Sequence, residues 1–298
     1  LQRGEPYLFH ILNRLEQDGM PAELALLPMV ESAFDPFATS PVGAAGIWQF
    51  MPETADYLGL NQDGWYDGRR DIIASTEAAL DYLGRLHKRF DGDWLLALAG
   101  YNAGGARVQR AIRKNRDSGK PSDFWHLALP AETRSYIPKL IALRTIIENP
   151  QDYNVTLPQL PDSRYFSTIE IQGQLELRVA ARLSGTPLQE LQRLNPGYDL
   201  SITPPGLTHT LLVPASVADI IRTRIALLPR EQRIQSIRYR VRLGDNLSTI
   251  AQRYRTTVSD IRRANRLDGS KIIAGDLLII PVETHEDTIA ANSHTISM

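Results

Sequence analysis

A single glutamate follows an apolar run near the start of the chain. Residues 24–30 read Leu-Ala-Leu-Leu-Pro-Met-Val, and Glu31 comes next. A carboxyl group at the end of an apolar helix face loses part of its hydration, which disfavours the charged form and raises the pKa. A carboxylic acid that stays protonated near neutral pH can donate a proton to a leaving oxygen. The sequence therefore predicts acid catalysis at Glu31, with a local cap or ion pair as the structural alternative.

Asp35 is the nearest candidate for a second acidic group. Most glycoside hydrolases use two carboxylates, one as acid and the other as nucleophile or base. Asp35 follows Glu31 by four residues, so on one helix the two side chains would be neighbours. Asp35 also precedes Pro36, and a residue before proline is pushed out of the α region. Asp35 is thus either a second catalytic carboxylate or the point where the helix ends.

The elements that position Glu31 are expected to be helices. Apolar residues recur at helical spacing in 7–18, 71–90 and 133–148, and the first 150 residues contain no convincing strand. We expect Pro28 to kink the helix before Glu31, because proline removes a hydrogen bond. The apolar helix 94–99 is expected to follow a cap at Asp93 and to break within the stretch 100–105.

Further motifs follow Glu31-Ser32 in a fixed order. They are Gly46-Ile47-Trp48-Gln49, then Ala99-Gly100-Tyr101-Asn102-Ala103-Gly104, then Glu132-Thr133-Arg134-Ser135-Tyr136. With Glu31-Ser32, this ordered set resembles the signature motifs of soluble-type lytic murein transglycosylases. The resemblance covers about residues 20–145. It implies a mainly α-helical catalytic domain similar to goose-type lysozyme.

The resemblance also implies a reaction with one carboxylate. Glu31 would protonate the oxygen between N-acetylmuramic acid and N-acetylglucosamine in peptidoglycan. The ionised Glu31 would then remove the proton from the muramyl 6-hydroxyl, which closes a 1,6-anhydro ring without consuming water. Two alternatives stay open: a hydrolytic lysozyme, and a non-catalytic protein that binds peptidoglycan or nucleic acid.

Several side chains are implied to contact the substrate. Tyr136 either reaches the carboxylate of Glu31 with its hydroxyl or lies in the core. The whole implied set is Ser32, Ser40, Gln49, Met51, Tyr101, Asn102 and Tyr136.

Some members of this set have simpler explanations. Ser32 can serve helix packing, Ser40 a turn, and Met51 the core. Trp48 departs from the family pattern, because many relatives carry methionine or leucine there, and it would alter a sugar subsite. Glu132 is expected to be structural rather than catalytic.

A small β-α-α-β pattern stands near the C-terminus. Ile237, Tyr239, Val241 and Leu243 alternate with arginines, which predicts a half-buried strand. A turn, two short helices and the apolar strand 277–281 follow. This unit resembles a LysM module, a fold that binds N-acetylglucosamine-containing glycans. The resemblance implies glycan contacts by Gly244, Asp245, Asn246, Leu247 and Asn265.

An earlier stretch repeats this pattern in weaker form. Asn195 and Asn265 are 70 positions apart, and Leu-Leu-Val-Pro at 211–214 parallels Leu-Ile-Ile-Pro at 278–281. We interpret the stretch as a degenerate LysM-like unit, with a chance helix–strand linker as the alternative. The expected class is α+β multidomain. Its parts are a lysozyme-like domain 1–150, a linker 151–164, a LysM-like unit 165–235, a LysM module 236–283 and a tail 284–298.

Composition limits the partners of the chain. The 298 residues carry a net charge of −1, yet residues 230–271 hold 11 basic residues against 4 acidic ones. A polyanion is therefore a possible partner, but these arginines have no aromatic platform beside them, so nucleic acid is not favoured. The chain has no cysteine and no HExxH, GxGxxG or P-loop motif, so we expect neither metal nor cofactor.

Location is expected from the resemblance rather than from the residues. No apolar run approaches the length of a membrane span. The chain begins at Leu1 without methionine, so a signal peptide or lipid anchor upstream would be invisible here. The resemblance implies a periplasmic enzyme of the bacterial envelope, membrane-anchored through such a missing segment.

Overall fold

A computed structural model describes residues 1–206, 208–234, 236–254 and 256–281. Contacts between residues divide the chain into two compact units. The first comprises Leu1–Asp63, Asp67–Ser167 and Arg193–Gly197, and the second the remaining residues. The expected tail 284–298 lies outside the described residues. Among the described helices, none is long and apolar enough to cross a membrane.

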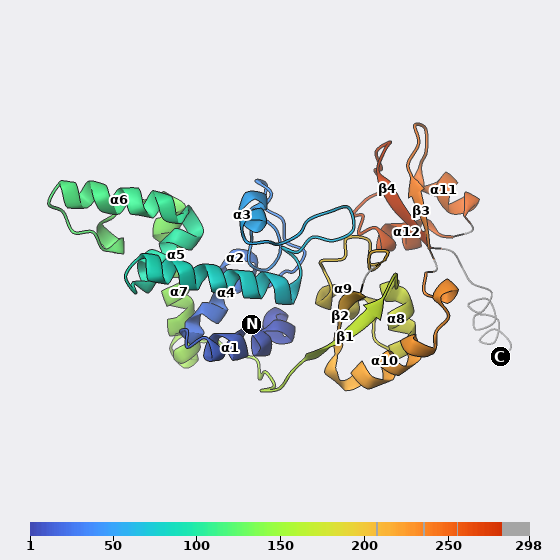
Figure 1. Ribbon diagram of the computed structural model, residues 1–298, viewed down its shortest axis with the longest axis horizontal. Coiled ribbons are helices and arrows are strands. Elements are labelled where there is room, and N and C mark those ends of the chain that lie inside the picture. The colour runs from blue at the N-terminus through green and yellow to red at the C-terminus, as the bar shows by residue number, and fades with distance from the viewer. Residues whose placement is uncertain (207, 235, 255, 282–298) are drawn as a thin grey trace. The chain divides into compact units, whose positions relative to one another are not determined.

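The first unit is helical, as the apolar periodicity predicts (Figure 1). Short 3-10 turns supplement the α-helices at Gln2–Gly4, Ala22–Leu26, Phe124–His126 and Pro150–Tyr153. The α-helices are α1 (Glu5–Gln17), α2 (Leu27–Ser32), α3 (Pro52–Tyr57), α4 (Ile72–Arg89), α5 (Trp94–Ala103), α6 (Gly105–Asp117) and α7 (Ala131–Glu148).

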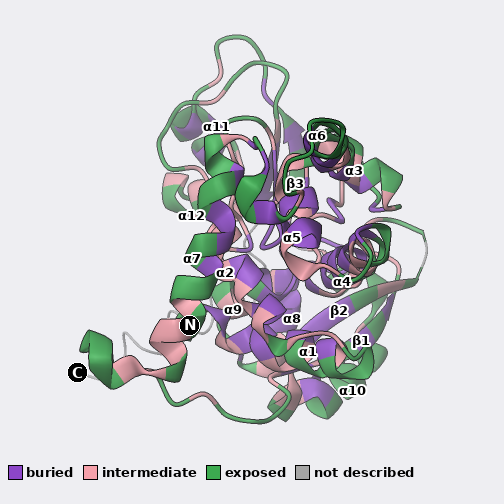
Figure 2. Ribbon diagram, turned by 90° about the vertical axis from the view of Figure 1, so that its left-hand side faces the viewer, coloured by how far each residue is buried: buried purple, intermediate pink, exposed green. Residues whose placement is uncertain are grey.

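Helix α5 is the centre of this unit. It packs against α4, α6 and α7, and Figure 2 shows it largely buried. The Asp93 side chain accepts a hydrogen bond from the Leu96 amide at 3.0 Å, which confirms the expected cap. Helix α4 begins in the same way, with Asp71 accepting from the Ala74 amide at 2.7 Å. The two capped helices α4 and α5 thus pack against each other in the first unit.

The expected kink at Pro28 is wrong. Pro28 lies in the first turn of α2, where a missing amide proton costs no hydrogen bond. The preceding residues, Ala22–Leu26, form a separate 3-10 turn. Helix α2 also ends earlier than Asp35, because Ala33 and Phe34 adopt left-handed backbone angles with φ of 50° and 58°. Glu31 therefore occupies the last turn of a short helix.

The expected helix break lies within the predicted stretch 100–105, near its end. Helix α5 runs through Gly100 and ends at Ala103, and Gly104, with φ of 85°, makes the break. Gly100 serves close packing instead, since a Cβ there would lie 2.9 Å from a ring carbon of Phe90. Tyr101 and Asn102 are therefore held in the last helical turn rather than in a loop.

A β-α-α-β arrangement follows the coil after residue 153. Its strands are β1 (Phe166–Gln172) and β2 (Thr208–Pro214), which pair in a two-stranded sheet, and its helices are α8 (Leu177–Ser184) and α9 (Leu188–Leu194). An additional helix, α10 (Ala218–Leu227), packs against α8 and was not foreseen from the sequence. Ile169, Leu177 and Leu211 lie in the shared core.

The C-terminal module pairs β3 (Ser236–Arg240) antiparallel to β4 (Leu277–Pro281), with Tyr239 opposite Leu278. Two helices, α11 (Leu247–Arg253) and α12 (Val258–Ala264), connect the strands. The predicted alternation holds for Tyr239 and Val241, which are buried. It fails at Leu243, which is 95% exposed because the strand stops at Arg240, and at Ile237, which lies within the strand and is 40% exposed.

Candidate active site

Glu31 lines a cavity of about 450 Å³ in the first unit. Helix α2 brings the carboxyl group to this cavity, while Leu27 of the same helix is fully buried. Helix α7 packs against both α2 and α5 and supplies part of the opposite wall. The position predicted from the apolar run is therefore realised as a largely buried acid facing a hollow.

Tyr136 contacts Glu31 directly. Its hydroxyl donates a hydrogen bond to Glu31 Oε1 at 2.6 Å. Burial raises the pKa of Glu31 from 4.5 to about 7, the hydrogen bond from Tyr136 lowers it, and the charge of Glu132 raises it. A carboxyl group with a pKa near 7 can both give and take a proton at neutral pH, which is what acid-then-base chemistry needs.

The loop from Ala38 to Gln49 forms another wall. Ser40 Oγ accepts a hydrogen bond from the Ala44 amide at 3.0 Å, so its own proton remains available to the cavity it lines. Gln49 Nε2 donates to the Gly46 carbonyl at 2.8 Å. Gln49 also has a left-handed backbone, with φ of 51°. A non-glycine residue held in this region is a strained arrangement that functional sites often contain.

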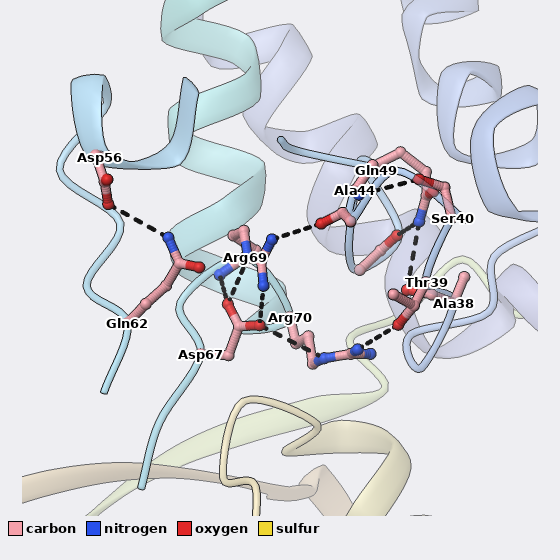
Figure 3. Close-up of polar contacts among 12 residues, drawn as sticks. Ala38, Thr39, Ser40, Ala44, Gln49, Asp56, Gln62, Asp67, Arg69 and Arg70 are labelled. Atoms are coloured by element: carbon pink, nitrogen blue, oxygen red, sulfur yellow. Dashed lines mark hydrogen bonds and ion pairs between the residues drawn. The ribbon is translucent and has the colours of Figure 1, made fainter. Parts of the chain in front are cut away.

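A charged brace fixes this loop from outside (Figure 3). Arg69 donates to both carboxylate oxygens of Asp67, at 2.9 and 2.8 Å, and to the Gly43 carbonyl at 2.8 Å. Arg70 donates to Thr39 Oγ1 at 2.6 Å. The two chain segments approach so closely that a Cβ on Gly46 would lie 2.1 Å from the Arg69 carbonyl oxygen. Only glycine fits at this point of the loop.

The remaining implied residues of the first unit also line the cavity, with one exception. Met51 contributes an apolar wall, and Tyr101 and Asn102 line the cavity from the end of α5. Tyr101 donates to the Trp48 carbonyl at 2.9 Å, and Asn102 Oδ1 accepts from Thr133 Oγ1 at 2.7 Å. The exception is Ser32.

Ser32 and Trp48 serve the framework. Ser32 does not line the cavity; its hydroxyl donates to the carbonyls of Pro28 and Ile47, at 3.1 and 3.0 Å. This contact matches the packing alternative and ties α2 to the loop. Trp48 is fully buried and donates to Thr76 Oγ1 at 3.0 Å, so the expected change of a sugar subsite is wrong.

Asp35 does not share the cavity of Glu31. The left-handed residues Ala33 and Phe34 turn the chain away, and Asp35 Oδ1 accepts from the Phe37 amide at 3.0 Å. Asp35 lines a different hollow, together with Pro36. A second carboxylate at Asp35 is therefore excluded by geometry.

Two charged residues were not anticipated in the wall. Glu132 accepts a long hydrogen bond from Asn102, at 3.4 Å, and acts on the pKa of Glu31. Lys139 lines the cavity one turn beyond Tyr136. Their spacing from Tyr136, four residues before and three after, was a signal available in the sequence, because positions i, i+4 and i+7 share one helix face.

The LysM module uses several implied residues for its own fold. Asn265 donates to the carbonyls of Ile261 and Ile279 and accepts from the Ile279 amide, each at 2.7 Å. Leu247 is buried. Asn246 caps α11 and shares a reciprocal capping box with Thr249.

The turn before α11 remains accessible. Gly244 has φ of 88° and is exposed, and Asp245 accepts hydrogen bonds from Tyr239 Oη at 2.6 Å and the Arg242 amide at 2.7 Å. The backbone of Gly244–Asn246 is thus fixed while one side of the turn faces solvent.

Family models match three parts of the chain. The model "Transglycosylase SLT domain" matches residues 11–124, "Lytic transglycosylase MltD, LysM-like domain" matches 165–229, and "LysM domain" matches 239–281. A lysozyme-like helical domain with a partly buried glutamate in its cavity, followed by LysM-like units, defines a lytic transglycosylase.

Curated relatives carry the same assignment. The chain is 41% identical over 305 residues to membrane-bound lytic murein transglycosylase D of Escherichia coli strain K12, covering 99% of this chain and 68% of that protein. It is 30% identical over 138 residues to membrane-bound lytic murein transglycosylase F of Marinobacter nauticus, covering 40% and 26%. The 70 kDa soluble lytic transglycosylase of Escherichia coli is similar with 25% identity and a TM-score of 0.36, over 45% and 22%.

The chain belongs to the lytic murein transglycosylase family. It is an enzyme that cleaves peptidoglycan by lytic transglycosylation. The alternative of a non-catalytic binding protein is accordingly wrong.

Proposed function

We propose that Glu31 is the catalytic acid and base of this reaction. The observation that carries the proposal is a partly buried carboxyl group with a pKa near 7, held by Tyr136 at 2.6 Å in a cavity without Asp35. The protonated Glu31 gives its proton to the oxygen that links muramyl C1 to N-acetylglucosamine. The C1–O bond breaks, and the neighbouring N-acetyl group stabilises the cationic sugar.

The same carboxylate completes the reaction. The muramyl 6-hydroxyl attacks C1, and Glu31 takes the hydroxyl proton, so a C1–O6 bond replaces the broken bond and no water is consumed. The hydrogen bond from Tyr136 favours the ionised state of Glu31 between these steps. Ser40, Gln49, Met51, Tyr101 and Asn102 are proposed to hold the sugars, since all five line the cavity.

Mass spectrometry of digested peptidoglycan tests this mechanism. We expect 1,6-anhydro-N-acetylmuramic acid ends from the natural enzyme and no cleavage by Glu31→Gln, which keeps the shape but has no proton to give. Reducing ends in place of anhydro ends would show a hydrolase. General acid catalysis typically increases the rate of a reaction by about 10²–10⁴-fold. Turnover by Glu31→Gln within about tenfold of the natural rate would therefore refute the role of Glu31.

The C-terminal part is proposed to bring the enzyme to its polymer. We propose a catalytic domain 1–150, a linker 151–164, a LysM-like unit 165–235 and a LysM module 236–283 that contacts glycan through the exposed turn at Gly244–Asn246. A tethered glycan binder raises the local substrate concentration without new catalytic contacts. Deleting residues 236–283 is expected to weaken binding to sacculi more than cleavage of short soluble fragments; equal losses would contradict this division.

A periplasmic location and membrane anchoring are part of the proposal. They rest on the printed name of the Escherichia coli relative, which describes a membrane-bound murein enzyme. Fractionation of cells that produce the natural full-length protein, with and without detergent, tests both.

A further inference from the structure

Among the described residues that line the Glu31 cavity, Lys139 is the one cation. It lies on α7 with Glu132 and Tyr136, seven and three residues before it. At 100° and 1.5 Å per residue, these three positions share one helix face, and Glu132 and Lys139 stand about 10 Å apart along the axis. Helix α7 therefore presents an acid, a hydroxyl and an ammonium group in sequence along one wall.

The ammonium group of Lys139 has no partner among the described residues. Lys139 is exposed, and within that part of the chain no carboxylate oxygen lies within 4.0 Å of it. Glu132, by contrast, is contacted by Asn102 and acts on Glu31. An unneutralised cation in a substrate cavity is available to the substrate.

The chemistry of the polymer identifies the group that this cation fits. Peptidoglycan strands alternate two sugars, both with neutral hydroxyl and acetamido groups. Only the muramyl residue carries carboxylates, either on its 3-O-lactyl substituent when the peptide has been removed, or on the attached stem peptide. An ammonium group binds a carboxylate by a charge-assisted hydrogen bond.

We propose that Lys139 binds a carboxylate carried by the muramyl side chain and thereby sets the register of the strand. The two linkages of the polymer alternate, so a strand shifted by one sugar presents the wrong bond to Glu31. A charge contact with every second sugar discriminates between these two registers, whereas hydrogen bonds to groups shared by both sugars do not. This inference rests on the proposed function of Glu31.

The test compares three glycan substrates. They are strands with stem peptides, strands stripped of peptide with free lactyl carboxylates, and stripped strands whose lactyl groups have been converted to methylamides. For Lys139→Met we expect kcat/KM to fall about tenfold on a carboxylate-bearing strand, as for a charge-assisted hydrogen bond, and to stay unchanged on the methylamide strand. A loss on stripped strands identifies the lactyl carboxylate, and a loss on peptide-bearing strands alone identifies the stem.

Matched variants separate charge from folding. Lys139→Arg is expected to keep the preference, and Lys114→Met, an exposed residue of α6 outside the cavity lining, to change nothing. Added salt should reduce the preference of the natural enzyme but not of Lys139→Met. An equal loss on all three substrates, or no loss on any, overturns the proposal.

The outcomes for Lys139 and for Glu31 are distinguishable. If the natural enzyme releases no anhydro ends from any strand, the proposed function fails. If it releases them and Lys139→Met keeps the natural ratio between charged and methylamide strands, only the register proposal fails.

Discussion

Tyr136 and Glu31, 105 residues apart in the chain, are joined by a hydrogen bond of 2.6 Å between the phenol oxygen and Oε1. Burial raises the pKa of Tyr136 well above its usual range, so the phenol remains the donor and the carboxylate the acceptor. The bond connects α7 to α2 across the cavity and opposes the effect of burial on Glu31. It is the contact that keeps one carboxyl group usable in both protonation states.

Removing this hydrogen bond should change both rate and pH dependence. The mechanism that we propose needs protonated Glu31, so kcat/KM should fall as pH rises above about 7. Tyr136→Phe removes the contact that lowers the pKa of Glu31, so this alkaline limb should move to higher pH while kcat falls about tenfold or more. A pH–rate profile measures both effects.

Tyr101→Phe is the matched control for this profile. Tyr101 lines the same cavity, but its hydroxyl donates to the Trp48 carbonyl and not to Glu31. Tyr101→Phe should leave the alkaline limb of the pH–rate profile in place. An equal displacement of this limb by Tyr101→Phe and Tyr136→Phe would contradict the role of Tyr136.

The burial of Glu31 should cost stability above its normal pKa. Between pH 4.5, its unperturbed pKa, and about pH 7, the folded protein binds more protons at this site than the unfolded chain does. The free energy of unfolding therefore falls as pH rises through this window, by up to about 3 kcal/mol.

Glu31→Gln should show this cost directly. It should match the natural protein at pH 4.5 and exceed its stability by about 1–3 kcal/mol at pH 8. Denaturant unfolding at the two pH values measures the difference, and a gap of the same size at both would mean that ionisation of Glu31 is not responsible.

Loss of the arginine brace should act mainly on substrate binding. Arg69→Met removes the guanidinium hydrogen bonds to Asp67 and to the Gly43 carbonyl, so we expect the free energy of unfolding to drop by about 1–3 kcal/mol. The loosened loop carries Ser40, so KM should rise more than kcat falls. Kinetics with a soluble glycan fragment separates the two constants.

Arg144→Gln is the comparison for this variant. It removes a solvent-exposed ion pair with Glu148 and should change stability by less than about 0.5 kcal/mol. If Arg69→Met is equally mild, the brace does not position the loop.

Asn265 offers a test of whether the LysM module needs this side chain for folding or for sugar. Asn265→Ala leaves both backbone groups of Ile279 without their partner and should destabilise the module by about 2–4 kcal/mol. Hydrogen exchange of β4 in the full chain should rise, and binding to sacculi should fall with it. Asn246→Ala, which removes a helix cap, should cost about 1 kcal/mol.

If Asn265→Ala loses binding to sacculi while the hydrogen exchange of β4 stays unchanged, Asn265 is not needed for folding of the module. The side chain would then contact glycan, as the resemblance implied.

The sequence alone determined the helical class and the order of the motifs, and it singled out Glu31 as the candidate acid. Glu31 could be selected because an apolar run of seven residues fixes its environment locally, and Asp93 could be identified as a cap because capping depends on neighbouring residues. The strands that end at Pro214 and Pro281 were also predicted, because each is marked by a local run of apolar residues.

The tertiary structure decided which side chains meet. Left-handed angles at Ala33 and Phe34 removed Asp35 from the cavity, and no local pattern announces them in non-glycine residues. The packing of α7 on α2 brought Tyr136, Glu132 and Lys139 to Glu31 across about a hundred residues of chain. Partners this distant in sequence are chosen by how helices pack, which local propensity does not encode.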